Sequence, residues 1–331
     1  MIHPRFLLAA MLSLAASLGH AAGLKFVHIA DDADGPAIDA AVWSPCAEAP
    51  QKVKVKGTTV SAVLDCPIAA EKMPLIVISH GYGGWYLGHH DTAEALADAG
   101  FMVVAINHPH ANHADMSEAN GLKPLRRRPA DIKRTIDFML GAFPDAAGID
   151  AQRIGFYGFS QGGYTGLVIG GANPDFNKLP PRCADPKAVN CPPSTSQVQT
   201  AGHSLPAESL THDARIKAIV VADPLSVVFQ TADSVKDVQV PLQLWASQLG
   251  GGAGASPKDI ATLAGLLPAR PDFRTVPNAV HFSFLTPCPP QSRNDACVDA
   301  PGFDRAAFHK AFNAEVLAFF RKHLIDRQQS Q

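Results

Sequence analysis

The chain has 331 residues, of which 47% are hydrophobic and 18% are charged, and its formal net charge is -2. This length and apolar content are enough to bury a large core in one or two domains. The near balance of charge gives no basic surface for nucleic acid or for an anionic membrane. The composition therefore excludes a disordered protein and a nucleic-acid partner, and it leaves the oligomeric state open.

The first residues have the pattern of a secretory signal. A basic start at Arg5 is followed by an apolar run over 6–18 and by small residues up to Gly23. The apolar run is too short to span a bilayer, and its end resembles a signal-peptidase site. We therefore expect a cleaved signal over 1–22 and a periplasmic or secreted protein; an uncleaved anchor is the alternative. No later segment is apolar over the length of a membrane span, so no stable membrane insertion is expected.

Six cysteines lie in the part predicted to be exported: Cys46, Cys66, Cys183, Cys191, Cys288 and Cys297. An even number in an oxidising compartment indicates disulfides. Proximity in the sequence favours the local pairs Cys46–Cys66, Cys183–Cys191 and Cys288–Cys297, although six cysteines allow 15 connectivities. The chain has no C-x-x-C pair, so a structural zinc site is not expected.

The hydrophobic pattern along the chain predicts an α/β protein. Short β-rich pieces fill 24–65, and strands then alternate with helices. The predicted strands are 74–80, 101–107, 153–158, 215–223, 240–247 and 272–278, and the predicted helices are 91–100, 129–140, 161–171, one from about 257, and 304–325. This alternation is typical of a mostly parallel sheet with helices on both faces. No repeat or linker divides the chain, so 23–331 is expected to be a single domain.

Two stretches depart from this rhythm. Residues 172–212 contain seven prolines and two cysteines, which predicts a long irregular insertion after a helix. The basic run "RRRP" at 126–129 precedes the helix that we expect to open at Pro129. Such a run is usually a solvated surface.

The motif Gly158-Phe159-Ser160-Gln161-Gly162 joins a predicted buried strand to a predicted helix. A serine at such a sharp turn projects its hydroxyl above the carboxyl edge of the sheet, and small flanking residues avoid clashes in the bend. A glycine-rich turn without chemistry is the alternative. Ser160 is the candidate nucleophile, and His281, which follows the last predicted strand, is its candidate base.

An acyl-transfer site also needs donors for the oxyanion that develops in the transition state. The glycine-rich turn "SHGYGG" follows the first buried strand, and we expect the backbone N–H of Tyr82 to be one donor. The N–H of Gln161, directly after the candidate nucleophile, is expected to be the other.

These segments resemble the α/β-hydrolase superfamily, and within it the dienelactone-hydrolase-like proteins and the platelet-activating factor acetylhydrolases. The resemblance covers most of 70–325 and depends on "PLIVISHGYGG", "FMVVAINHP", "RIGFYGFSQGGYTG", "AIVVADP" and "HFSF". It implies an α/β-hydrolase fold and the hydrolysis of small carboxylic esters without a cofactor, through an acyl-enzyme formed by a Ser-Asp-His triad. Two residues differ from these relatives: Ser160 stands where dienelactone hydrolases have cysteine, and Phe159 where many acetylhydrolases have histidine.

The acid of the triad is not determined by its type alone, because nine acids lie between Ser160 and His281. The loop after the predicted strand 240–247 is the commonest position in this fold, but it offers no acid before Asp259, in the first turn of a predicted helix. The preceding strand ends directly on Asp223. The acetylhydrolases place their acid after this earlier strand, so we predict Asp223; a turn-forming Asp-Pro pair is the alternative.

Two other classes of function are open. The histidines of "NHPHANHAD", with His89 and His90 upstream, could assist hydrolysis through a metal, although their spacing matches no known ligand motif. A non-catalytic binding protein on a hydrolase fold is the other class. The sequence therefore predicts an exported serine esterase without metal or cofactor, with these two alternatives.

Overall fold

A computed structural model describes residues 21–179 and 210–326. Its centre is a ten-stranded sheet with the strand order β10-β9-β8-β7-β5-β6-β2-β1-β4-β3. The first 20 residues of the predicted signal and the predicted pair Cys183–Cys191 lie outside the described residues, as does most of the predicted insertion.

The strands follow the predicted pattern closely. Their bounds are β1 Ala21–Ile29, β2 Ile38–Cys46, β3 Lys52–Val55, β4 Thr58–Leu64, β5 Met73–Ser79, β6 Met102–Ile106, β7 Ile149–Phe159, β8 Ile216–Ala222, β9 Leu242–Ser247 and β10 Asp272–Val276. Strands β5 to β10 form the parallel part of the sheet, in which β5 pairs with β6 and β7, and β7, β8, β9 and β10 pair in turn. Strands β1 and β2 extend it as an antiparallel pair. The first two residues of β1 belong to the segment predicted as a signal.

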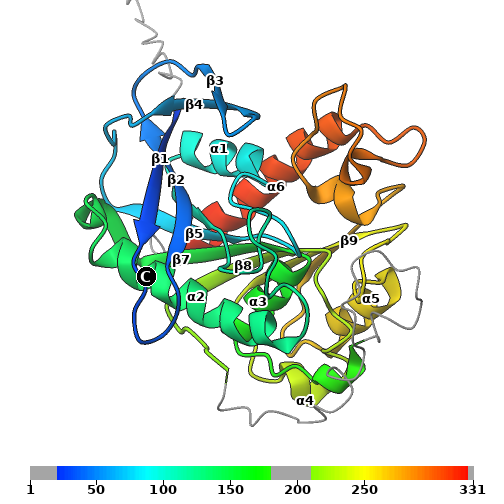
Figure 1. The fold of residues 1–331 in the computed structure, drawn as a ribbon. Helices are drawn as coiled ribbons and strands as arrows, with labels where there is room; N and C mark the ends of the chain where they lie inside the picture. The colour runs from blue at the N-terminus through cyan, green and yellow to red at the C-terminus, as the bar shows by residue number, and fades with distance from the viewer. Residues whose placement is uncertain (1–20, 180–209, 327–331) are drawn as a thin grey trace, which may run out of the picture.

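Helices cover both faces of the sheet (Figure 1). Their bounds are α1 His90–Asp98, α2 Leu122–Leu140, α3 Gln161–Ile169, α4 Ala232–Val235, α5 Pro257–Leu266 and α6 Arg305–Leu324. One core contains the apolar side chains of α1 and α6, with Phe312 and Val316 at the four-residue spacing predicted for the last helix. The other core contains those of α2, α3 and α5, such as Ile132 and Leu167. The predicted α/β class is thus confirmed.

Helix α2 corrects one prediction. It begins at Leu122, seven residues before the expected start at Pro129, and Pro129 lies inside it. A proline inside a helix has no N–H for the carbonyl four residues earlier, which here is that of Leu125. The hydroxyl of Tyr164 in α3 donates to this Leu125 carbonyl at 3.2 Å. A side chain from another helix therefore compensates for the proline. Because this partner is distant in the sequence, the local sequence around Pro129 could not predict it.

The interpretation of "RRRP" as a solvated surface is also wrong. Because this run lies within α2 and not before it, its side chains point in different directions around the helix. Arg128 points into the protein and is 0% exposed. Arg127 is mostly buried as well, with 14% of its side chain exposed.

Two of the three predicted disulfides are present. Cys46–Cys66 joins the end of β2 to the segment after β4, and Cys288–Cys297 closes a loop ahead of α6. In the chain-entropy model, closing loops of this size stabilises a fold by about 3 kcal/mol each.

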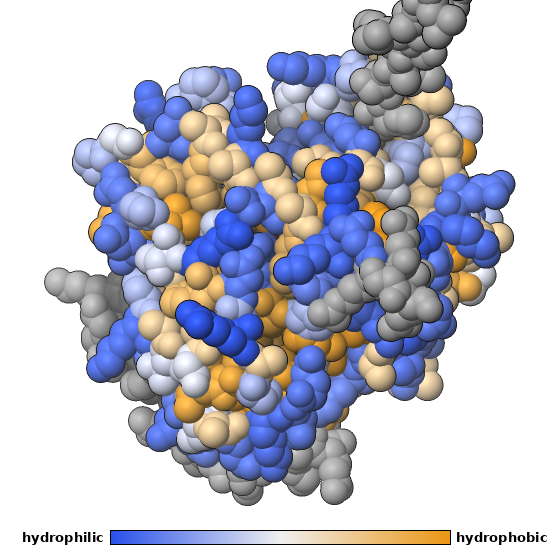
Figure 2. All heavy atoms as spheres, turned by 180° about the vertical axis from the view of Figure 1, so that it is seen from behind, coloured by the Kyte–Doolittle hydropathy of each residue, from blue (hydrophilic) through white to orange (hydrophobic). Residues whose placement is uncertain are grey.

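The described surface mixes polar and apolar residues. On the side opposite to that of Figure 1, apolar patches lie between hydrophilic side chains (Figure 2). None of the described helices is both long enough and apolar enough to cross a bilayer.

Candidate active site

The carboxyl ends of the parallel strands bring the candidate residues to one edge of the sheet. The turn with Tyr82 follows β5, Ser160 follows β7, Asp223 follows β8, and His281 lies after β10. Since neighbouring parallel strands end on the same side, residues from four distant parts of the chain share this edge.

Ser160 occupies a strained turn between β7 and α3. Its φ of 55° and ψ of -115° lie where few residues other than glycine are found. Such a conformation costs on the order of 1–3 kcal/mol and persists only when its surroundings enforce it. The bend also requires close approach: a Cβ on Gly158 would lie 2.2 Å from the Gly162 oxygen, and one on Gly162 would lie 1.9 Å from the Ser79 oxygen. The glycines of the motif are therefore required by packing.

Backbone hydrogen bonds hold Ser160 beside Asp223. The Ser160 N–H donates to the Ala222 oxygen at 3.0 Å, and the Ser160 oxygen accepts from the Leu225 N–H at 3.0 Å. These partners flank Asp223 in the sequence. The Ser160 turn and the end of β8 are thus a connected backbone unit.

Asp223 accepts a hydrogen bond from His281. Its Oδ2 lies 2.7 Å from His281 Nδ1, and the aspartate and histidine are 0% and 4% exposed. Ser247, at the end of β9, donates its N–H to Oδ1 and its hydroxyl to Oδ2, both at 2.7 Å. The carboxylate is therefore fixed by three donors, and it selects the His281 tautomer that carries a proton on Nδ1 and leaves Nε2 as a base.

The loop after β9, the commonest position of the acid in this fold, contacts His281 instead. The His281 N–H donates to the Gly250 oxygen at 2.7 Å. A Cβ on Gly252 would lie 2.5 Å from His281 Nδ1, so only glycine leaves room for the ring there. Asp259, the alternative acid, pairs with the hydroxyl of Ser256 at 2.6 Å and helps to cap α5.

The proposed oxyanion turn lies against Ser160. A Cβ on Gly81 would lie 3.1 Å from the Ser160 Cβ, so the backbone next to Tyr82 passes directly beside the serine. The Tyr82 side chain is tethered through its hydroxyl, which donates to Asn120 Oδ1 at 3.0 Å. Helix α3 begins at Gln161, and the N–H of a first helical residue has no acceptor within its own helix.

Phe159, which stands where many acetylhydrolases have histidine, packs against His281. The ring centroids of Phe159 and His281 are 4.7 Å apart. The ring of His89 also lies 5.5 Å from that of Phe159. Phe159 therefore supports the His281 ring from inside the protein.

The His-rich loop does not gather into a metal site. No group of three or more His, Cys, Asp or Glu side chains that could hold an ion occurs within 21–179 and 210–326. His108 pairs with Asp131 at 2.8 Å, His110 pairs with Asp115 at 2.7 Å, and the His113 ring packs on Trp85. These histidines are thus engaged separately.

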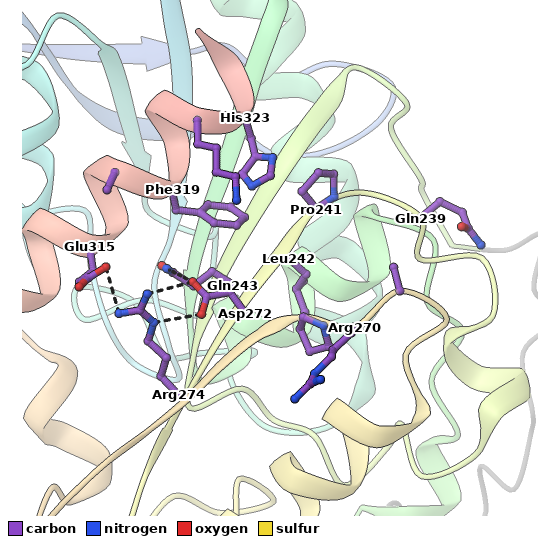
Figure 3. A pocket seen from close by; sticks show the side chains of 14 residues that line it. Gln239, Pro241, Leu242, Gln243, Arg270, Asp272, Arg274, Glu315, Phe319 and His323 are labelled. Carbon is purple, nitrogen blue, oxygen red and sulfur yellow. Dashed lines mark hydrogen bonds and ion pairs between the residues drawn. The ribbon is translucent and has the colours of Figure 1, made fainter. Parts of the chain in front are cut away.

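A surface groove of about 630 Å³ lies at the opposite edge of the sheet (Figure 3). It is lined by the starts of β9 and β10 and by one side of α6. Its central charges are already paired, because Arg274 contacts Asp272 at 3.1 Å and Glu315 at 3.0 Å. Because none of its lining residues belongs to the candidate site, the groove is separate from that site.

Two supporting residues of the site were not singled out from the sequence. Ser247 could have been noticed as a polar residue that ends a buried strand, which is where site residues gather in this fold. Gly252 had no such signal, because three glycines in a row resemble any loop.

Comparison with known families and structures supports the fold and the class of reaction. Residues 64–222 match the BD-FAE family model, which describes an esterase domain. No curated protein matches the chain. A ferulic acid esterase from Streptomyces cinnamoneus superposes with a TM-score of 0.63 at 18% identity, over 94% of this chain and 91% of that one.

Two further structures share the fold. A protein assigned as a dienelactone hydrolase from Klebsiella pneumoniae has a TM-score of 0.55 at 14% identity, over 91% of this chain and 98% of that one. A protein assigned as a dipeptidyl aminopeptidase IV from Bacteroides ovatus has a TM-score of 0.52 at 14% identity, over 92% of this chain and 36% of that one. Together these comparisons lead to one conclusion: the chain has the α/β-hydrolase fold, and its residues 64–222 match a family of esterase domains.

Proposed function

We propose that the chain is an exported serine esterase in which Ser160 is the nucleophile, His281 the general base and Asp223 the acid that orients it. The observation that carries this proposal is the buried Asp223–His281 hydrogen bond of 2.7 Å beside the strained turn at Ser160. A carboxylate, an imidazole and a serine at these three positions are the components of acyl transfer in this fold.

In the first half of the reaction, the Ser160 hydroxyl attacks the ester carbonyl while His281 Nε2 takes its proton. The negative charge on the carbonyl oxygen is stabilised by the N–H groups of Tyr82 and Gln161, each typically worth about 3 kcal/mol in the transition state. Asp223 stabilises the imidazolium. The intermediate then collapses, His281 returns the proton to the alcohol that leaves, and an acyl-Ser160 ester remains.

In the second half, a water molecule gives its proton to His281 Nε2 and attacks the acyl-Ser160 carbonyl. The same two N–H groups stabilise the second oxyanion. When this intermediate collapses, Ser160 regains its proton from His281 and the carboxylic acid is released. The cycle consumes one ester and one water, and needs no metal or cofactor.

We predict a preference for short acyl chains. We attribute this preference to the predicted insertion at 172–212, most of which lies outside the described residues, and expect it to shape substrate access. Within a panel of p-nitrophenyl esters of increasing acyl length, acetate and butyrate should show the highest kcat/KM. Long-chain esters that exceed them by about tenfold would contradict this, since each methylene in a fitted pocket changes kcat/KM by roughly 10-fold or more.

An aromatic ester belongs in the same panel. The side chains of Met116, Leu249 and Phe282 are 38%, 53% and 39% exposed. Phe282 directly follows His281, and Leu249 directly precedes Gly250, whose carbonyl accepts from the His281 N–H. Met116 would lie 3.3 Å from a Cβ on Gly83, in the proposed oxyanion turn. All three therefore border the candidate site. They offer an apolar rim to a ring, and one structural neighbour is a ferulic acid esterase. Methyl ferulate tests this directly.

Export is the other part of the proposal. Peptide mapping of the unreduced protein from the periplasm or medium should find Gly23 at the N-terminus and three local disulfides, Cys46–Cys66, Cys183–Cys191 and Cys288–Cys297. The two disulfides of the described residues support an oxidising compartment. A retained Met1 would contradict cleavage, and cross-pairs or free thiols would contradict the pairing.

A further inference from the structure

Arg128 is a charged side chain that the proposed mechanism does not use. It lies in α2 and is 0% exposed. Burial lowers its pKa to about 9, so the guanidinium keeps its charge at neutral pH. A buried charge is costly unless its donors find specific acceptors. The acceptors of Arg128 therefore indicate what it does.

The donors of Arg128 reach the two backbone segments that carry the proposed oxyanion donors. On one side, Nη2 donates to the His80 carbonyl oxygen and lies 3.4 Å from the hydroxyl of Ser79, at the end of β5. On the other side, Nε donates to the hydroxyl of Thr165 in α3 at 3.1 Å. One guanidinium thus links β5 and α3 beneath the site.

Each link ends close to a proposed donor. The His80 carbonyl belongs to the peptide directly before the Gly81–Tyr82 peptide, which carries the Tyr82 N–H. The Thr165 hydroxyl donates to the Gln161 carbonyl at 2.8 Å, in the residue whose own N–H is the second proposed donor. A donor displaced by as little as 1 Å from a developing charge can cost about 100-fold in rate. The spacing between the two segments therefore matters for catalysis.

His80 makes the first segment rigid. The His108 N–H donates to His80 Nε2 at 3.1 Å, so the His80 proton is on Nδ1, which donates to the Gly81 carbonyl at 2.6 Å. Burial holds the pKa of His80 well below its usual range, so the ring is neutral. The Gly81 carbonyl lies in the same peptide as the Tyr82 N–H, and a hydrogen bond to that carbonyl polarises the N–H.

A second Ser-His-Asp set braces this arrangement. His108 lies 2.8 Å from Asp131 through Nδ1 and 2.8 Å from the Ser79 hydroxyl through Nε2. Ser79, His108 and Asp131 are at most 1% exposed, so no substrate reaches them. Burial raises the pKa of Asp131 to about 7, which shows how strongly this brace is removed from water. It is a support for Arg128 and β5, and not a second catalytic centre.

We propose that Arg128 is a positioning residue for the oxyanion hole, which sets the distance between the Tyr82 and Gln161 N–H groups through the His80 carbonyl and the Thr165 hydroxyl. This inference rests on the proposed function. It adds that the geometry of the hole is determined from α2, a helix that contributes no group to the reaction itself.

Thr165→Val tests the link while it preserves the shape of the side chain. With p-nitrophenyl acetate we expect kcat to fall by roughly 10-fold and KM to change little, because the loss is in transition-state stabilisation. The ratio of kcat/KM for the oxygen ester to that for its thiono analogue should fall as well, since sulfur is a poor acceptor and the ratio reports the oxyanion donors. Thr165→Ser, which retains the hydroxyl, should restore both values.

Thr135→Val is the matched control. Thr135 is equally buried, at 0% exposure, and its hydroxyl donates to the carbonyl four residues earlier at 2.8 Å, as that of Thr165 does. It has no bond to Arg128, so kcat and the oxygen-to-thiono ratio should stay at wild-type values. Arg128→Lys is the second test variant: one ammonium cannot span both acceptors, and the ratio should fall below that of Thr165→Val.

The outcomes separate this inference from the proposed function. If the wild type hydrolyses the ester and Ser160→Ala does not, but Thr165→Val and Arg128→Lys keep the oxygen-to-thiono ratio of Thr135→Val, the positioning role is wrong and the triad stands. A rise in KM at unchanged kcat also overturns it. If Ser160→Ala remains active, the proposed function fails, and the positioning role fails with it. Should Thr165→Val not fold, Arg128→Lys decides by the same ratio.

Discussion

Ser160→Ala is expected to lower kcat for p-nitrophenyl acetate by roughly 10⁴- to 10⁶-fold, because the acyl-enzyme can no longer form. The fold should remain intact, since alanine fits the space of serine. KM and the thermal midpoint would then stay near their wild-type values. A phosphonate probe should label the wild type on the peptide that contains Ser160 and should not label the variant.

Ser234→Ala is the matched control for this substitution. Ser234 is also buried, at 5% exposure, but it lies in α4 and donates to the Thr231 carbonyl. Its loss should leave kcat unchanged. Hydrolysis by Ser160→Ala at the wild-type rate would overturn the serine mechanism. The same assays with EDTA address the alternative that depends on the His-rich loop: activity that is lost with the chelator and restored by a metal would favour it.

A non-catalytic role is tested by the same measurements. A non-catalytic binding protein would have an incomplete set of catalytic groups at the carboxyl edge of the sheet. The serine, the histidine, the carboxylate and the glycine-rich turn all lie at this edge, which argues against a fold that has lost its chemistry. Binding of esters without turnover by the wild type would reverse that argument.

The strands and the sharp turn at Ser160 could be predicted because their signals are local. A short apolar run bounded by turn residues indicates a strand covered on both faces, and β5 and β6 match their predicted ranges to within one or two residues. The Ser160 turn could be found because its close contacts involve residues of its own motif, as between Gly158 and Gly162. Such contacts can be inferred from a short stretch of sequence.

The start of α2 and the position of Arg128 could not be predicted, because both depend on tertiary partners. The carbonyl that Pro129 leaves without a donor within α2 accepts instead from Tyr164 of α3. Arg128 is buried where Ser79, His80 and Thr165 offer acceptors from two other elements to its Nε and Nη2. Neither set of partners is recognisable until the fold brings them together. The contact between the loop after β9 and His281 could not be predicted for the same reason, since Gly250 and His281 are 31 residues apart in the sequence.

Asp223→Asn is expected to lower kcat by about 10⁴-fold without unfolding the protein. The side chain would keep an oxygen towards the Ser247 N–H, which now donates to Oδ1 at 2.7 Å. Its new amide group would then face His281 Nδ1, where a carboxylate oxygen now lies at 2.7 Å. Because an amide donates there, Nδ1 must become an acceptor, and the ring proton moves to Nε2. The histidine then holds a proton at the atom that has to receive one from Ser160.

Asp259→Asn separates this explanation from the alternative acid on the later loop. Asp259 accepts from Ser256 at the start of α5, so its replacement weakens only a helix end, worth about 1 kcal/mol or less, and should leave kcat within about twofold of wild type. Both variants should show wild-type KM, and circular dichroism should find the same helix content in each. Steady-state kinetics with p-nitrophenyl acetate decides between the two acids. A severe loss in Asp259→Asn with a mild one in Asp223→Asn would mean that the acid lies after β9, and that the contact of Asp223 with His281 is only structural.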